Sequence, residues 1–237
     1  MNALEFQTPS DYHSGPQVAL QQRPESMQNS RLAVLLSVAF AFAGALTSAQ
    51  AQDAAAAPAD DITRGGVLSD TCMGCHGIPG YRNAYPSFRV PKLGGQHPEY
   101  IVLALQGYKN QTRPHKTMHA QAVSLSDQDM RDIAAFFTSE DKVEPITSPV
   151  GTAPAKAATC VACHGEGGVS VTPNWPILAG QHKDYIEHAL GEYKLATRKD
   201  PVMGSQAAAL TPQDIKELAT FFSAQTGLAA VHYANKK

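Results

Sequence analysis

The chain has 237 residues, 43% of them hydrophobic and 7% aromatic, so it can form one large domain or two small ones. Its 19 lysine and arginine residues and 21 aspartate and glutamate residues give a formal net charge of -2. This balance argues against a nucleic-acid-binding protein, which usually carries a basic surplus or a basic stripe. The cysteines number only four, so their placement is more informative than their count.

The first 51 residues are predicted to be a targeting segment. An apolar run at residues 32–46 is followed by Ala49-Gln50-Ala51, a small-x-small cleavage signature. A membrane span needs about 20 apolar residues, so a cleaved signal is favoured over a span. Residues 1–26 lack the basic character of a signal, whereas a well-proportioned signal peptide begins at Met27. We therefore expect translation from Met27, export to the periplasm, and a mature chain that begins near Gln52 with a flexible linker at 52–60.

An internal repeat follows. Residues 91–101 (PKLGGQHPEYI) match residues 176–186 (PILAGQHKDYI) at an offset of 85 positions (176 − 91). The same offset aligns Arg113 with Arg198 and Met118 with Met203. A domain of this size builds a weak core unaided, and a large apolar cofactor in each half would strengthen it.

The repeat predicts two tandem domains. The first covers residues 61–142 and the second 153–237, and a proline-containing linker joins them at 143–152. A short Ala-rich helix is expected at 154–159, just before the second pair of cysteines, Cys160 and Cys163.

The fold class is predicted to be all-α. Tyr100, Ile101, Ala104, Leu105 and Tyr108 recur on one face of a helix, and the second copy repeats the pattern. The last helix of each half has a start signal that resembles a capping box: Ser126 with Asp129, and Thr211 with Asp214. No useful alternating strand pattern is present, and Gly/Pro-rich loops at 77–95 and 165–180 connect the helices.

The chemistry is concentrated in two C-x-x-C-H motifs. They are built from Cys72, Cys75 and His76, and from Cys160, Cys163 and His164. This pattern is the attachment signal of c-type haem. Two cysteines three positions apart in a helical turn face the same way, so their sulfurs can reach two vinyl groups on one haem edge. The following histidine then binds the iron, so two covalent haem c groups are expected.

Paired cysteines also occur in sites other than haem attachment. A C-x-x-C pair can be a redox dithiol or part of a zinc site, and two pairs could form one four-cysteine zinc site or two disulfides. Both pairs, however, are followed by histidine, and each lies in its own copy of the repeat without a strand pattern nearby. Haem attachment is therefore preferred.

The sixth iron ligand is predicted to be methionine. Met118 and Met203 are repeat-matched and precede the last helix of each half, and thioether sulfur favours Fe(II). His97 and His182 are matched rivals, for which a structural role at a helix start is favoured. His119 adjoins Met118 and could compete with it for iron. The unmatched Met73 and Met130 are interpreted as core residues.

Together these motifs resemble the dihaem cytochrome c4 family over about residues 61–225. The resemblance implies two class I cytochrome c folds with a pseudo-twofold relation and the axial pairs His76/Met118 and His164/Met203. It also implies that the carbonyls of Pro91 and Pro176 steady the proximal histidines. Arg113 and Arg198 are then expected to pair with haem propionates, with a solvated surface role as the alternative.

The favoured function is an electron carrier of a respiratory chain, not an enzyme. Its expected partners are a membrane-bound quinol-oxidising complex and a terminal oxidase, with peripheral membrane association possible. The alternative is a haem peroxidase or the cytochrome subunit of a dehydrogenase that oxidises sulfide or thiosulfate. Two matched methionines leave no open iron position, which favours the carrier.

Overall fold

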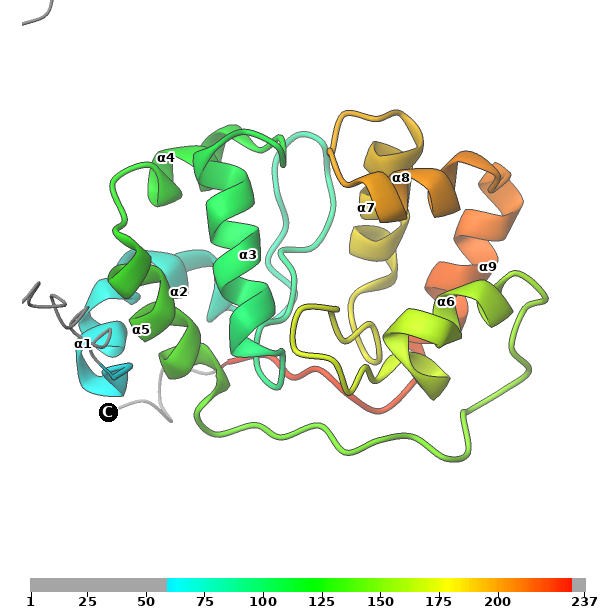
Figure 1. The fold of residues 1–237 in the computed structure, drawn as a ribbon, viewed down its shortest axis with the longest axis horizontal. Helices are drawn as coiled ribbons and strands as arrows, with labels where there is room; N and C mark the ends of the chain where they lie inside the picture. The colour runs from blue at the N-terminus through cyan, green and yellow to red at the C-terminus, as the bar shows by residue number, and fades with distance from the viewer. Residues whose placement is uncertain (1–58, 232–237) are drawn as a thin grey trace, which may run out of the picture. The chain divides into compact units, whose positions relative to one another are not determined.

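The computed structural model describes residues 59–231, which form helices joined by irregular loops (Figure 1). Within this range, β-pairing is limited to two isolated bridges, Arg82 with Arg89 and Gly94 with Ala229. The predicted all-α fold is confirmed. No helix in this range is long and apolar enough to cross a membrane, and the predicted signal segment lies outside the described residues.

The first half contains five helices. They are α1 (Ile62–Leu68), α2 (Asp70–His76), α3 (Pro98–Lys109), α4 (Lys116–Ala122) and α5 (Asp127–Thr138). The predicted tyrosine helix is α3. The predicted capping box starts α5, because the Ser126 and Asp129 side chains each accept a hydrogen bond from the other's backbone N–H. The buried face of α5 carries Phe136 and Phe137 into the first core, as its periodicity predicts.

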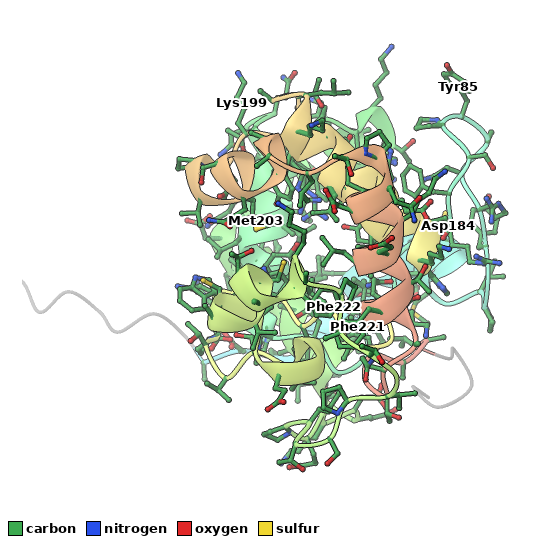
Figure 2. The ribbon with its side chains drawn as sticks, turned by 90° about the vertical axis from the view of Figure 1, so that its right-hand side faces the viewer. Tyr85, Asp184, Lys199, Met203, Phe221 and Phe222 are labelled. Atoms are coloured by element: carbon green, nitrogen blue, oxygen red, sulfur yellow. The ribbon has the colours of Figure 1, made fainter. Side chains whose placement is uncertain are left out.

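The second half repeats α2 to α5. It contains α6 (Ala157–His164), the short 3₁₀ helix η1 (Glu166–Gly168), α7 (Lys183–Lys194), α8 (Pro201–Ala208) and α9 (Pro212–Ser223). The Thr211–Asp214 capping box is also formed, and Pro212 occupies the first turn, where its missing N–H costs nothing. Phe221 and Phe222 of α9, labelled in Figure 2, fill the second core.

The second half has no counterpart of α1 within the described residues. The helix expected at 154–159 is wrong in its limits, because the helical conformation begins only at Ala157 and then runs through the second motif. The preceding stretch contains Pro149 and Pro154, which have no N–H to donate, and Gly151, whose φ is 79°. These residues favour an irregular linker over a helix.

The C-terminal segment after α9 returns to the first half (Figure 1, red). The Ala229 N–H donates to the Gly94 carbonyl over 2.9 Å, and Val231, which is 2% exposed, packs in the first core. Residues 229–231, which belong to the predicted second domain at 153–237, therefore pack on the first half. The internal repeat does not predict this contact, because the packing of a C-terminal tail on a distant core has no repeated sequence pattern.

Candidate functional site

A single continuous cavity of about 540 Å³ lies between the two halves. It is lined mainly by apolar side chains. The lining also includes every cysteine, proximal histidine and methionine that the sequence singles out: Cys72, Cys75, His76, Met118, Cys160, Cys163, His164 and Met203. The structure thus brings both predicted sets together in one space, and Figure 2 labels Met203 on α8.

The four cysteines lie on helices α2 and α6, all partly exposed and none in a disulfide. Within the described residues, no three or more His, Cys, Asp or Glu side chains are grouped so that they could hold a metal ion. Burial raises the pKa of the Cys72 and Cys160 thiols. Reactive redox cysteines need a lowered pKa, so the dithiol alternative is also disfavoured.

The proximal histidines are held by two equivalent hydrogen bonds. His76 Nδ1 lies 3.0 Å from the Pro91 carbonyl oxygen, and His164 Nδ1 lies 2.8 Å from that of Pro176. A carbonyl can only accept, so each Nδ1 donates and each Nε2 is left able to bind a metal. Desolvation lowers the pKa of His76 to about 4 and also lowers the pKa of His164. Both imidazoles are therefore neutral at neutral pH, the form that binds metal.

The two matched methionines occupy the same place in short helices. The Met118 N–H in α4 donates to His115 Nδ1 over 3.2 Å, and the Met203 N–H in α8 donates to Asp200 Oδ1 over 2.8 Å. His115 and Asp200 align in the repeat, so two different side chains perform the same N-capping role. His119 does not line the cavity, and its Nδ1 lies 2.9 Å from the Tyr108 carbonyl oxygen.

The two histidines considered as alternative sixth iron ligands lie outside the cavity. His97 and His182 are the N-cap residues of α3 and α7, and neither lines the cavity. The ring of His97 reaches across to the second half, where Nε2 lies 2.8 Å from the Ser170 carbonyl oxygen. Met73 and Met130 are 4% and 0% exposed in the first core, as expected for packing residues.

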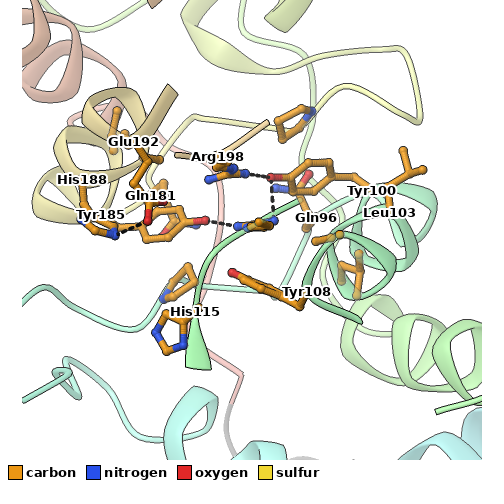
Figure 3. A pocket seen from close by; sticks show the side chains of 18 of the residues that line it. Gln96, Tyr100, Leu103, Tyr108, His115, Gln181, Tyr185, His188, Glu192 and Arg198 are labelled. Carbon is orange, nitrogen blue, oxygen red and sulfur yellow. Dashed lines mark hydrogen bonds and ion pairs between the residues drawn. The ribbon is translucent and has the colours of Figure 1, made fainter. Parts of the chain in front are cut away.

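Arg113 and Arg198 meet in the cavity between the halves. They are 8% and 6% exposed, so the solvated surface alternative is wrong. Arg113 donates to the hydroxyls of Tyr185 and Tyr100, and Arg198 donates to the Tyr100 hydroxyl over 3.1 Å (Figure 3). Within the described residues, neither guanidinium forms an ion pair with a carboxylate.

The tyrosines of this cluster were missed as site residues. Sequence periodicity marked Tyr100 as part of a buried helix face but could not show that its hydroxyl bonds to both arginines. Burial raises the pKa of Tyr100, but the two guanidiniums outweigh this and leave it below its ordinary value. Each guanidinium also lies 4.5 Å from the ring centre of a tyrosine in its own half, Tyr108 or Tyr193.

A family model, known sequences and solved structures are similar to this chain. The cytochrome c family model matches residues 62–140 and 151–225. A cytochrome c4 of Azotobacter vinelandii is 37% identical over 69% of this chain and 88% of that protein. A thiosulfate dehydrogenase electron acceptor of Stutzerimonas stutzeri is 31% identical over 76% of this chain and 91% of its own length. The crystal structure of reduced cytochrome c4 from Pseudomonas stutzeri superposes with a TM-score of 0.55 at 29% identity, over 72% of this chain and all of that one.

Proposed function

This chain belongs to the cytochrome c family, in its dihaem cytochrome c4 branch, and we propose that it shuttles electrons between periplasmic redox partners through two haems. Its two C-x-x-C-H motifs, one in each cytochrome c domain, carry two covalent haem c groups with their iron. Like its cytochrome c4 relatives, it is an electron carrier rather than an enzyme.

One observation carries the proposal. Thiols, a neutral histidine and a methionine from each half line one mainly apolar cavity. In the first half, helix α2 supplies Cys72, Cys75 and His76, while helix α4, farther along the chain, supplies Met118. This donor set suits haem c, which needs two thioether bonds, an imidazole ligand and an apolar enclosure.

The side chains then have distinct roles. His76 and His164 would bind iron through Nε2, and the carbonyls of Pro91 and Pro176 hold their ring planes. Met118 and Met203 would supply soft sulfur ligands, which favour Fe(II) and would raise the reduction potential. When bound, each haem iron takes up and releases one electron.

Arg113 and Arg198 would hold the propionates. Two buried cations without carboxylate partners are costly, and tyrosine hydroxyls compensate their charge only partly. Propionate carboxylates in the same cavity would neutralise both guanidiniums with charge-assisted hydrogen bonds. This pairing would also fix the orientation of both cofactors at the boundary between the halves.

The test replaces one methionine at a time. Met118→Ala and Met203→Ala should each remove one sulfur-to-iron absorption feature from the oxidised protein and lower one of the two reduction potentials. Met130→Leu is the matched control, because Met130 is buried in the core and does not line the cavity. If both absorption features survive in either alanine variant, the ligand assignment is wrong.

The name of one relative, a thiosulfate dehydrogenase electron acceptor, suggests an electron donor. We propose that a periplasmic dehydrogenase, of the kind that oxidises thiosulfate, is a donor besides a quinol-oxidising complex, and that a terminal oxidase is the acceptor. Stopped-flow reduction of the purified protein by each donor would compare their second-order rate constants. Mass spectrometry of the exported protein should give two haems and a start near Gln52.

A further inference from the structure

One peptide unit connects each proximal histidine to the opposite half. The Pro91 carbonyl accepts from His76 Nδ1, and the N–H of the same peptide, on Lys92, donates to Gln181 Oε1 over 2.9 Å. Gln181 belongs to the second half. A continuous chain of hydrogen bonds therefore runs from its side-chain amide through one peptide plane to the histidine of the first half.

The second half has the same arrangement in reverse. The Pro176 carbonyl accepts from His164 Nδ1, and the Ile177 N–H donates to Oε1 of Gln96, in the first half, over 2.9 Å. Each glutamine completes a two-point clamp, because its Nε2 donates to the carbonyl of the same residue: Gln96 to Ile177 over 3.1 Å and Gln181 to Lys92 over 3.0 Å.

Both glutamines are fixed in place. Each is 5% exposed, and both are labelled within the cavity in Figure 3. Their Oε1 atoms also accept from the N–H of the next residue, at 3.0 Å in both halves, just before α3 and α7. A buried amide with all these partners holds its orientation, so the peptide that it clamps is held as well.

We propose that Gln96 and Gln181 are positioning residues for the haem of the opposite half, each setting the strength of the hydrogen bond that the distant proximal histidine donates. This inference rests on the proposed histidine ligation. Accepting from the peptide N–H polarises the peptide and makes its carbonyl a stronger acceptor. A stronger acceptor makes the imidazole more basic and stabilises Fe(III). Loss of a glutamine therefore raises the reduction potential of the opposite haem.

The experiment compares Gln96→Met and Gln181→Met, in the full protein with both haems. Methionine fills the same space without hydrogen bonds. The two potentials are first assigned to their halves with the Met118→Ala and Met203→Ala variants. Gln96→Met should then shift the reduction equilibrium of the second-half haem about threefold toward Fe(II), which is about 28 mV for one electron. Gln181→Met should do the same to the first-half haem.

Gln225→Met is the matched control. Gln225 is also a buried amide, 4% exposed, but it ties Val150 of the linker to α9 and touches neither proline peptide. It should shift neither potential by more than a third of that amount. A shift confined to the glutamine's own half, an equal shift in both halves, or no shift would overturn the inference. Proper haem content and sulfur-to-iron features in those variants would leave the proposed function intact.

A measurement on the unchanged protein covers the case in which neither variant retains both haems. The amide hydrogens of Lys92 and Ile177 are predicted to exchange with solvent at one common slow rate, because the same separation of the halves exposes both. Fast exchange at either amide would show that the clamp is not formed and would overturn the inference.

Discussion

Gly65 is predicted to set the distance between helices α1 and α5. An alanine Cβ at this position would lie 2.5 Å from the carbonyl carbon of Asp132 and closer still to its oxygen, and 3.1 Å from Phe136 Cβ. Carbon atoms in contact prefer a separation of about 3.5–4.0 Å. Because the obstacle is the backbone of α5, Gly65→Ala must push the two helices apart by about 1 Å.

The free-energy cost of Gly65→Ala comes from the packing and the hydrogen bonds between α1 and α5 that this movement strains. Overpacking of a core costs about 1–3 kcal/mol. Two hydrogen bonds to Asp132 join the helices, one from the Asp61 N–H (2.9 Å) and one from the Arg64 guanidinium. The bond from the Asp61 N–H to this charged carboxylate is worth about 1.5–3 kcal/mol. Alanine recovers about 1 kcal/mol of helix propensity. The net loss of unfolding free energy should be about 1.5–5 kcal/mol.

The assay is guanidinium unfolding of the holoprotein, followed by far-UV circular dichroism and by the sulfur-to-iron absorption of each half. Gly191→Ala in α7 is the control, since its added Cβ meets nothing within 4 Å. That variant should be unchanged or stabilised by up to about 1 kcal/mol. If Gly65→Ala is as stable as the parent protein, the close approach of α1 to α5 does not limit the fold and the reasoning fails.

Two more predictions concern charge and capping. Burial raises the pKa of Asp132, but hydrogen bonds from the Asp61 N–H, Gln128 and Arg64 outweigh it and leave the pKa below its ordinary value. The native carboxylate thus adds stability above about pH 4, which is lost as the pH falls through its native pKa, so Asp132→Asn should flatten the acid side of the stability profile in urea titrations. Thr211→Ala should lower the unfolding free energy by about 1 kcal/mol, whereas Thr211→Ser, which keeps the hydroxyl, should not.

The sequence predicts what depends on local pattern. The capping boxes at Ser126 and Thr211 and the two C-x-x-C-H helices are encoded within a few residues, and the structure contains all of them. The aligned motifs GQH also hold Gln96 and Gln181, so the repeat marked them without showing their purpose. Their partners are more than 80 positions away, and no periodicity encodes a contact of that range.

The irregular segments were the least predictable part of the fold, because their contacts are also with distant residues. The C-terminal tail reaches the first half through one backbone bond, Ala229 to Gly94, and one buried side chain, Val231. Backbone bonds carry little sequence information, because every residue except proline has the same donor and acceptor. The surface alternative for Arg113 was wrong for a similar reason. Arginine is usually exposed, and only the tyrosines that surround Arg113 in the fold show why it is buried here.

The cross-half clamps also explain why two haem domains of this size remain together in one chain. An isolated half would lose the four hydrogen bonds that the glutamines form with the backbone of Lys92 and Ile177 and would expose its buried amide. At about 1 kcal/mol each, these bonds amount to roughly 4 kcal/mol, a large share of the 5–15 kcal/mol that stabilises a typical domain. Because each clamp acts on the peptide that holds the other half's histidine, the same contacts that stabilise the pair connect the ligand environments of its two irons. Mutational change in either half is therefore constrained by the other, which is consistent with the preserved GQH motif in a repeat whose loops and capping residues have diverged.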